Sequence, residues 1–97
     1  MLNCLCQVFN SEGKSLRKFG KKGVGASEFK SPNGIAVDSF GNWVVSDYDT
    51  KMVQAFTPTG QLIGIISIAP HSPMAICVDR DDRILVAHWD CVNVFCF

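Results

Sequence analysis

One stretch of the sequence occurs twice, and the two copies are separated by 41 residues. Residues 31–49 align with residues 72–90, and seven of the 19 positions are identical. Most of the remaining positions keep their apolar or polar character. Because a tandem repeat is one structural unit used twice, the fold has to place equivalent segments in equivalent surroundings.

The first copy and the residues after it have the pattern of four short β-strands. Runs rich in apolar, β-branched and aromatic residues lie at 35–38, 43–47, 52–56 and 61–66. Turn sequences separate these runs, with Gly41 and Gly60 at positions that favour a positive φ. A repeat of four strands and about 40–50 residues is typical of a β-propeller blade.

Incomplete copies flank this unit. Upstream, residues 7–13 match residues 54–60 at an offset of 47, which predicts strands at 4–9 and 14–19. Downstream, strands are expected at 75–79, 84–89 and 91–96. The predicted fold class is therefore all-β. We expect an incomplete β-propeller of about nine antiparallel strands, with one full four-stranded blade flanked by two partial blades.

The predicted boundaries divide the chain into four segments. They are the end of one blade (1–20), an inter-blade connection (21–34), a complete blade (35–67) and three strands of the next blade (68–97). A closed propeller needs at least about four blades. We expect a longer parent protein to supply the remaining blades, and closure by several copies of this chain is the alternative.

The formal net charge is zero, but the charges are unevenly distributed. Residues 1–30 carry six basic and two acidic side chains, whereas residues 31–97 carry three basic and seven acidic ones. No apolar run approaches the ~18 residues that span a membrane. The first residues also lack the basic flank and apolar core of a secretory signal. The chain is therefore expected to be cytoplasmic and not membrane-bound.

Five cysteines are present, at positions 4, 6, 77, 91 and 96. An odd number without a Cys-x-x-Cys pair does not indicate a disulfide framework or a zinc site. The expected role is that of reduced, small hydrophobic side chains in the core. No cofactor or metal is predicted; the alternative is a metal site made of two cysteines with His71 or His88.

The motifs resemble the NHL repeat. The residues that carry the resemblance are Pro-x-Gly-Ile-Ala-Val-Asp, Gly-Asn-x-Val-Val-Ser-Asp and Val-Gln-x-Phe-x-x-x-Gly within 32–60, with a degraded copy at 73–95. Residues 8–32 resemble the junction between blades of tripartite-motif (TRIM) NHL proteins. Such proteins carry a RING, B-boxes and a coiled coil before a six-bladed propeller. The resemblance implies a parent that is a TRIM-like E3 ubiquitin ligase scaffold. The RING and B-box zinc ligands are absent from this sequence, so the chain itself is expected to be non-catalytic.

In propellers, the inter-blade connections and the loops between the second and third strands open on one face. In NHL relatives this face binds RNA in some members and protein partners in others. The candidate ligand-binding residues here are Lys18, Lys21, Lys22, Lys30, Tyr48, Lys51 and Trp89. Lysines attract phosphates without reading sequence. Tyr48 and Trp89 occupy equivalent positions in the two copies, where they are expected to stack on bases or anchor a peptide if they are exposed.

Other interpretations of these residues stay open. The lysines also fit a solvated loop, and the two aromatic side chains also fit burial between blades. The chain as a whole also fits purely structural blades without ligand contact, or a fragment of an NHL-type metal-dependent lyase. Spacing gives neither histidine a nucleophile or carboxylate partner. Asp38 and Asp79, and likewise Asp49 and Asp90, recur beside turns, which predicts that they accept backbone hydrogen bonds there.

Overall fold

The computed structural model describes residues 6–89 and 92–95, which form only strands, turns and connecting segments. The fold is all-β, as expected. No described segment is a helix long and apolar enough to span a membrane. The strands are β1 (Cys6–Phe9), β2 (Ser15–Phe19), β3 (Lys21–Lys22), β4 (Glu28–Phe29), β5 (Pro32–Val37), β6 (Trp43–Asp47), β7 (Met52–Phe56), β8 (Leu62–Ser67), β9 (Ala75–Val78), β10 (Ile84–Ala87) and β11 (Val92–Phe95).

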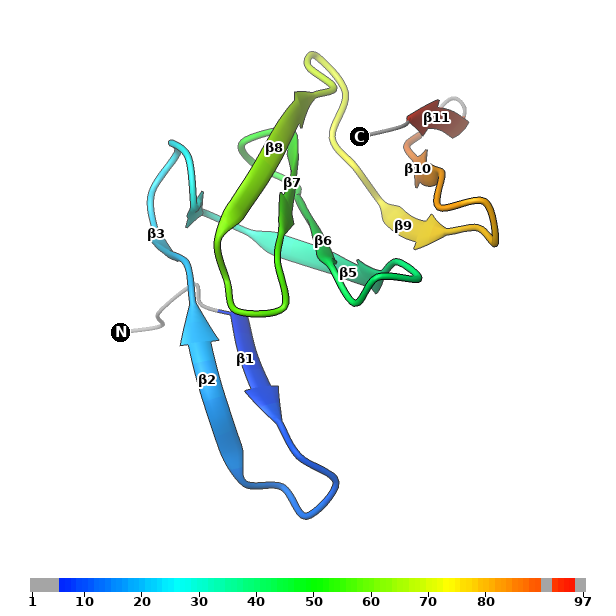
Figure 1. Ribbon diagram of the computed structural model, residues 1–97. Coiled ribbons are helices and arrows are strands. Elements are labelled where there is room, and N and C mark those ends of the chain that lie inside the picture. The colour runs from blue at the N-terminus through cyan, green and yellow to red at the C-terminus, as the bar shows by residue number, and fades with distance from the viewer. Residues whose placement is uncertain (1–5, 90–91, 96–97) are drawn as a thin grey trace.

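Three antiparallel sheets follow one another along the chain (Figure 1). The hairpin β1–β2 comes first, and the four-stranded sheet β5-β6-β7-β8 follows it. The three-stranded sheet has the order β11-β10-β9. Within the described ranges, nine strands are therefore antiparallel, as predicted. None of these sheets closes on itself.

The predicted strands differ from the observed ones mainly near residue 32. Strand β5 begins at Pro32, within the stretch expected as a connection, because Pro32 and Gly34 already pair with the end of β6. A β-bulge between these two residues lets the chain enter the sheet early.

The connection before β5 contains a short parallel pair that the sequence did not predict. Strands β3 and β4 pair over two residues each, and Phe29, the second residue of β4, is fully buried. The side chain of Gln54, in the middle of β7, accepts a hydrogen bond from the backbone N–H of Ser27 and donates one to the carbonyl of Glu28, both at 2.8 Å. The connection is thus held across one face of the four-stranded sheet.

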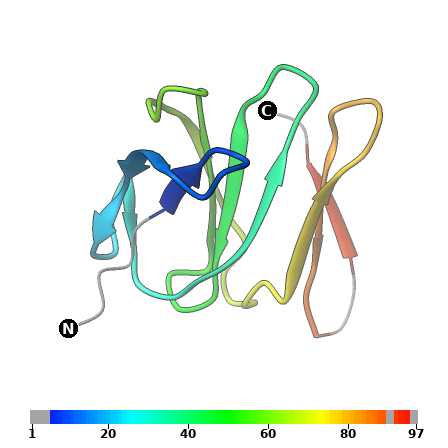
Figure 2. The ribbon, with the colours of Figure 1, turned by 90° about the horizontal axis from the view of Figure 1, so that it is seen from below.

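Two apolar clusters lie on opposite faces of the four-stranded sheet. The first contains Val44 and Val53 and packs against β9–β11 through Ile84 and Val86. The second contains Phe29, Val45 and Phe56, with Cys6, Phe19 and Trp43 packed against it. Side chains of successive residues along a strand point to opposite faces, so β6 supplies both clusters, with Val44 in the first and Val45 in the second. Figure 2 shows the resulting order, with the hairpin on one side of the four-stranded sheet and β9–β11 on the other.

The two copies of the 41-residue repeat occupy equivalent places in this order of packed sheets. Val45 and its equivalent Val86 both face the preceding sheet. Val44 faces the following sheet, and its equivalent Leu85 lies on the face of β9–β11 that none of the described sheets covers. Strands β5 and β9, each at one edge of its sheet, lie side by side. The second copy therefore packs onto the first through Ile84 and Val86. These are the equivalents of Trp43 and Val45, through which the first copy packs onto the hairpin and the connection.

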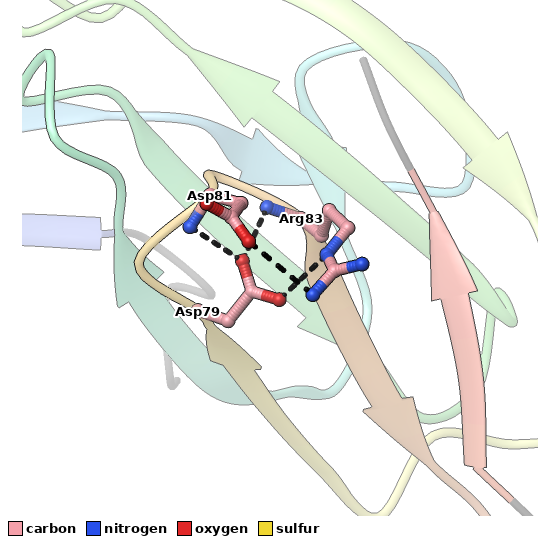
Figure 3. Close-up of polar contacts among 3 residues, drawn as sticks. All are labelled: Asp79, Asp81 and Arg83. Carbon is pink, nitrogen blue, oxygen red and sulfur yellow. Dashed lines mark hydrogen bonds and ion pairs between the residues drawn. The ribbon is translucent and has the colours of Figure 1, made fainter.

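Equivalent turns have equivalent hydrogen bonds. Asp38 Oδ1 accepts the N–H groups two and four residues later, at 2.9 and 2.8 Å. Asp79 Oδ1 does the same with Asp81 and Arg83, both at 2.9 Å, and Figure 3 shows this turn. The predicted turn role of both aspartates is confirmed. Asp82 replaces Gly41 with a φ of 59° against 82°, and aspartate is among the residues that tolerate this region.

Candidate ligand-binding cleft

Four loops lie at one end of the two larger sheets. Pro32 pairs with Asp47 and Met52 pairs with Ser67, so the segments beyond these pairs share that end of the four-stranded sheet. Ala87 pairs with Ala75 at the corresponding end of the neighbouring sheet. We call this the loop end; it comprises residues 30–31, 48–51, 68–74 and 88–89. The opposite end, which carries the turns at 38–42, 57–61 and 79–83, is the turn end.

A buried carboxylate organises one half of the loop end. Asp47 is fully buried. Its oxygens accept the backbone N–H of Lys30 at 2.7 Å and of Ser31 at 3.1 Å. They also accept the N–H groups of Asp49 and Thr50, both at 3.0 Å. One side chain thus joins the inter-sheet connection to the β6–β7 loop.

The other half of the loop end is organised by two histidines. The rings of His71 and His88 stack with centroids 4.3 Å apart and an interplanar angle of 16°. His88 is buried, and its Nε2 lies 3.0 Å from Asn93 Nδ2 on β11. His71 is exposed on the connection between β8 and β9. This stack joins that connection to the end of β10.

Between the two halves lies a cleft of about 350 Å³. Tyr48 and Trp89 line it, with exposed fractions of 44% and 88%. Its remaining lining residues come from the β8–β9 connection and are Pro70, His71, Ser72 and Met74. Both aromatic side chains are therefore exposed to solvent in this structure.

The lysines predicted for the same site are dispersed. Lys30 and Lys51 lie at the loop end, where their backbone N–H groups bond to the carboxylate and the carbonyl of Asp47. Lys21 and Lys22 lie on β3, and Lys21 Nζ is 3.5 Å from Glu28 Oε2. Lys18 lies on β2. The residue before it, Arg17, donates a hydrogen bond to the carbonyl of Pro58 at the turn end, so Lys18 is on the side of that end. The structure thus unites Tyr48 with Trp89 and places Lys30 and Lys51 near them, but it does not bring the five lysines into one patch.

Three contributors to the site were missed by the sequence analysis. The bonding role of Asp47, the stacking of His71 and the lining role of Met74 were not predicted. A signal existed, because the 41-residue offset aligns His71 with Lys30 and His88 with Asp47. The repeat indicates that the two histidines meet only once the contact between Lys30 and Asp47 in the first copy is known from the structure.

The described cysteines do not follow one pattern. Cys6 is partly buried, and burial raises the pKa of its thiol to about 11, so the thiol is neutral at pH 7. Cys77 is exposed, which corrects its assignment to the core, because no sheet covers its face of β9. The other three cysteines lie outside the described residues. Within 6–89 and 92–95, no three His, Cys, Asp or Glu side chains gather to hold a metal ion.

No protein-family model matches the chain. The NHL resemblance therefore depends on the repeated motifs of the sequence.

Proposed function

We propose that this chain is a non-catalytic interaction module that binds a protein segment in the cleft between Tyr48 and Trp89. It would form part of an NHL-type propeller in a TRIM-like E3 ligase scaffold. The observation that carries the proposal is that two exposed aromatic side chains, one from each copy of the repeat, line a single cleft.

The lining of the cleft has the composition of a protein-binding site. Tyrosine, tryptophan and methionine are enriched in protein interfaces, and aromatic anchors supply much of the binding free energy. Met74 is 52% exposed, and its flexible thioether adapts to partners of different shape. No lysine, arginine or carboxylate is among the cleft's lining residues in the described part of the chain. Contact there therefore removes apolar surface from water without stripping a charge of its hydration.

Protein is favoured over RNA because the basic side chains do not follow the cleft. A groove that binds single-stranded nucleic acid combines stacking aromatics with a basic track for the backbone. Here Lys18 lies toward the turn end and Lys21 is paired with Glu28. Lys30 and Lys51 are at the loop end and Lys22 pairs with Phe29 directly before Lys30, but none of these lysines lines the cleft.

Two observations support the propeller as the setting of this module. Each of the two repeated sheets contacts the sheet before it through the same positions of the repeat, as successive blades of a propeller do. In addition, a groove of about 410 Å³ lies beside the β1–β2 hairpin, β5 and β6. Trp43 lines this groove, and its Nε1–H is buried without an acceptor among the described residues. In a propeller, the inner strands of the preceding blade would occupy this groove and supply such an acceptor.

The test begins with selection of peptides from a displayed library against the chain. The affinity of a selected peptide is then measured for the wild type, Tyr48→Ala, Trp89→Ala and Phe40→Ala. Phe40 is a matched control, because it is an aromatic side chain 77% exposed at the turn end. Loss of an anchor costs about 2 kcal/mol, so each cleft variant should bind about 30-fold more weakly. The control should bind normally.

The same variants distinguish the competing functions. If RNA is the ligand, a labelled oligouridine binds with salt-sensitive affinity that falls in Lys21→Glu/Lys22→Glu. If the chain is purely structural, no peptide affinity depends on Tyr48 or Trp89. Either result contradicts the proposal.

A further inference from the structure

The third strand of the repeat occurs three times along the chain. It forms residues 6–9 of β1, 53–56 of β7 and 92–95 of β11, and each time an amide side chain stands two residues before a phenylalanine. Strands β7 and β11 pair with the strands that precede them, β6 and β10. Among the described residues, β1 pairs with β2 alone. The hairpin β1–β2 is therefore a third and a fourth strand without the first and second strands of its sheet.

The three-stranded sheet lacks a strand of the kind that the hairpin contains. In the four-stranded sheet β8 follows β7, whereas no described strand follows β11. Ile63 on β8 faces the three-stranded sheet, because it lines a cavity of about 250 Å³ together with Ile84, but it remains 48% exposed. A fourth strand in the three-stranded sheet would lie over β8 and cover this side chain.

Phe9 is an apolar side chain of the hairpin that lacks the contacts of its equivalents. Cys6 packs onto the four-stranded sheet, so Phe9, three residues later on β1, points to the opposite face of the hairpin and is 53% exposed. Its equivalent Phe56 is fully buried, and Phe95 packs against the cluster that contains Val44. In the place of Phe95, Phe9 would pack against that cluster in the same way.

The packing between the two copies of the repeat also has both of its surfaces exposed elsewhere on the molecule. Within the chain, Val44 of the first copy lies in one cluster with Ile84 of the second. The equivalent of Val44 is Leu85, on the face that none of the described sheets covers. The equivalent of Ile84 is Trp43, which lines the open groove of about 410 Å³ beside β1. One end of the molecule thus presents the surface that the other end would cover.

We infer that the chain associates head to tail with a second molecule of the same chain by strand exchange. The hairpin β1–β2 of the second molecule replaces β11 beside β10 and forms the sheet β9-β10-β1-β2. The number of strand pairings is unchanged, because the pair β10–β1 replaces the pair β10–β11. The association therefore depends on the apolar surface that it newly buries, at Phe9, Leu85 and the groove beside Trp43.

The charge distribution favours contact between unlike ends. Residues 1–30 carry six basic and two acidic side chains, and residues 31–97 carry three basic and seven acidic ones, so the two parts have net charges of +4 and −4. Because the two contact surfaces differ, the association is heterologous and can close into a ring. Each molecule contributes two four-stranded sheets, and a closed propeller has about four to eight, so a ring contains about two to four molecules.

The experiment measures the mass of the full chain by analytical ultracentrifugation from about 1 μM to about 500 μM, in a reducing buffer that prevents cross-linking through Cys77. The wild type should form a species of about two to four molecules. Phe9→Asp and Leu85→Asp each place a charge in the contact and should weaken association at least about 100-fold. Val24→Asp is the control, since Val24 is 68% exposed on the connection between β3 and β4, and it should associate like the wild type.

A mixture of the two defective variants tests the head-to-tail arrangement. Phe9→Asp keeps an intact three-stranded sheet and Leu85→Asp keeps an intact hairpin, so the mixture should form a one-to-one complex and nothing larger. Cys77→Asp, on the same uncovered face as Leu85, replaces Leu85→Asp if that variant does not fold by circular dichroism. A wild type that is monomeric at every concentration would overturn the inference. So would a mixture that stays monomeric or variants that associate normally.

Hydrogen exchange of the wild type tests the exchange of strands. In the associated species, the amides of residues 6–9 should exchange at least about fivefold more slowly than in the dilute monomer, and those of residues 92–95 at least about fivefold faster. Residues 92–95 that stay equally protected would show that β11 is not displaced and would overturn the exchange. The contact uses the faces of the sheets and not the Tyr48–Trp89 cleft, so peptide binding tests the proposed function separately.

Discussion

Asp47 is the residue on which the largest number of described loop contacts depends. Its carboxylate is buried and accepts four backbone N–H groups from two segments that are distant in sequence. Backbone donors buried without an acceptor cost about 1–3 kcal/mol each, although part of this is recovered when water enters. The residue is therefore structural, and its position between the loops makes it a support for Tyr48.

Replacing Asp47 tests this role. Asp47→Ala should lower the free energy of unfolding by about 3 kcal/mol, because the orphaned N–H groups lie in a buried setting. Chemical denaturation monitored by circular dichroism measures the change. Asp81→Ala is the control, since Asp81 is exposed and its ion pair with Arg83 has a separation of 3.5 Å. Equal destabilisation by both variants would disprove the assigned role of Asp47.

Asp79 gives a prediction about pH. The backbone N–H of Arg83 lowers the pKa of this carboxyl from its ordinary value of 3.8, with further contributions from the Arg83 guanidinium and the N–H of Asp81. A lowered pKa means that the folded turn prefers the charged form. The stabilisation is thus fully present above about pH 5 and is lost as the pH falls through the folded-state pKa below 3.8.

The measurement compares the wild type with Asp79→Asn. The variant should be less stable at pH 6, and the difference between the two proteins should shrink as the pH is lowered toward 3. A difference that stays constant over this range would show that the charge of Asp79 does not stabilise the turn.

At the scale of the strands, the contact between β5 and β9 depends on a glycine. A Cβ added at Gly34 would lie 2.7 Å from Ser46 Oγ and 2.9 Å from Ile76 Cγ2. The equivalent residue of the second copy is Ala75, which is exposed because no described sheet packs against it. The repeat thus has glycine where β9 approaches closely and alanine where no described sheet does.

Gly34→Ala should therefore separate the two sheets slightly. The expected loss is about 1–3 kcal/mol of unfolding free energy, the usual cost of overpacking. Ala75→Gly is the matched control and should cost less than about 1 kcal/mol. Thermal denaturation of both variants measures the difference. Gly34→Ala as stable as the wild type would contradict the close approach of β5 and β9.

The sequence predicted the antiparallel strands well because their signal is local. Alternation, β-branched residues and turn glycines occur within each strand, and the repeat supports each assignment from a second copy. The β3–β4 pair was missed because two-residue strands have no such pattern, and β4 is held in place by distant residues: Gln54 bonds to its backbone, and Val45 and Phe56 pack against its Phe29. The histidine stack was missed for the same reason, since it joins a connection to a strand that the chain reaches 17 residues later.

The candidate site was predictable in part. Tyr48 and Trp89 were found through the repeat, and the structure places them in one cleft. The lysines were assigned to the same face from the general layout of propellers. Lys18 departs from that layout, because Arg17 and Phe19 on either side of it approach the turn at 57–60. Such a contact cannot be inferred from spacing along the chain.

At the scale of the whole molecule, the packing order of the sheets gives equivalent residues of the two copies different degrees of burial. Val44 is 2% exposed beneath β9–β11, whereas its equivalent Leu85 lines the face that no described segment covers. Val44→Asp should cost more than about 3 kcal/mol of unfolding free energy because it buries an unpaired charge. Leu85→Asp should cost about 1 kcal/mol. Urea denaturation measures the loss of unfolding free energy in both variants, and equal losses would contradict the packing order of the sheets.

The central claim is that two copies of one repeat build a single binding cleft at the loop end. The most direct measurement is an amide chemical-shift map of the chain with a selected peptide. The account predicts that the shifts concentrate in residues 30–31, 48–51, 68–74 and 88–89 and vanish in Tyr48→Ala/Trp89→Ala. Shifts confined to the turn end or to the uncovered face of β9–β11, unchanged in that variant, would contradict it.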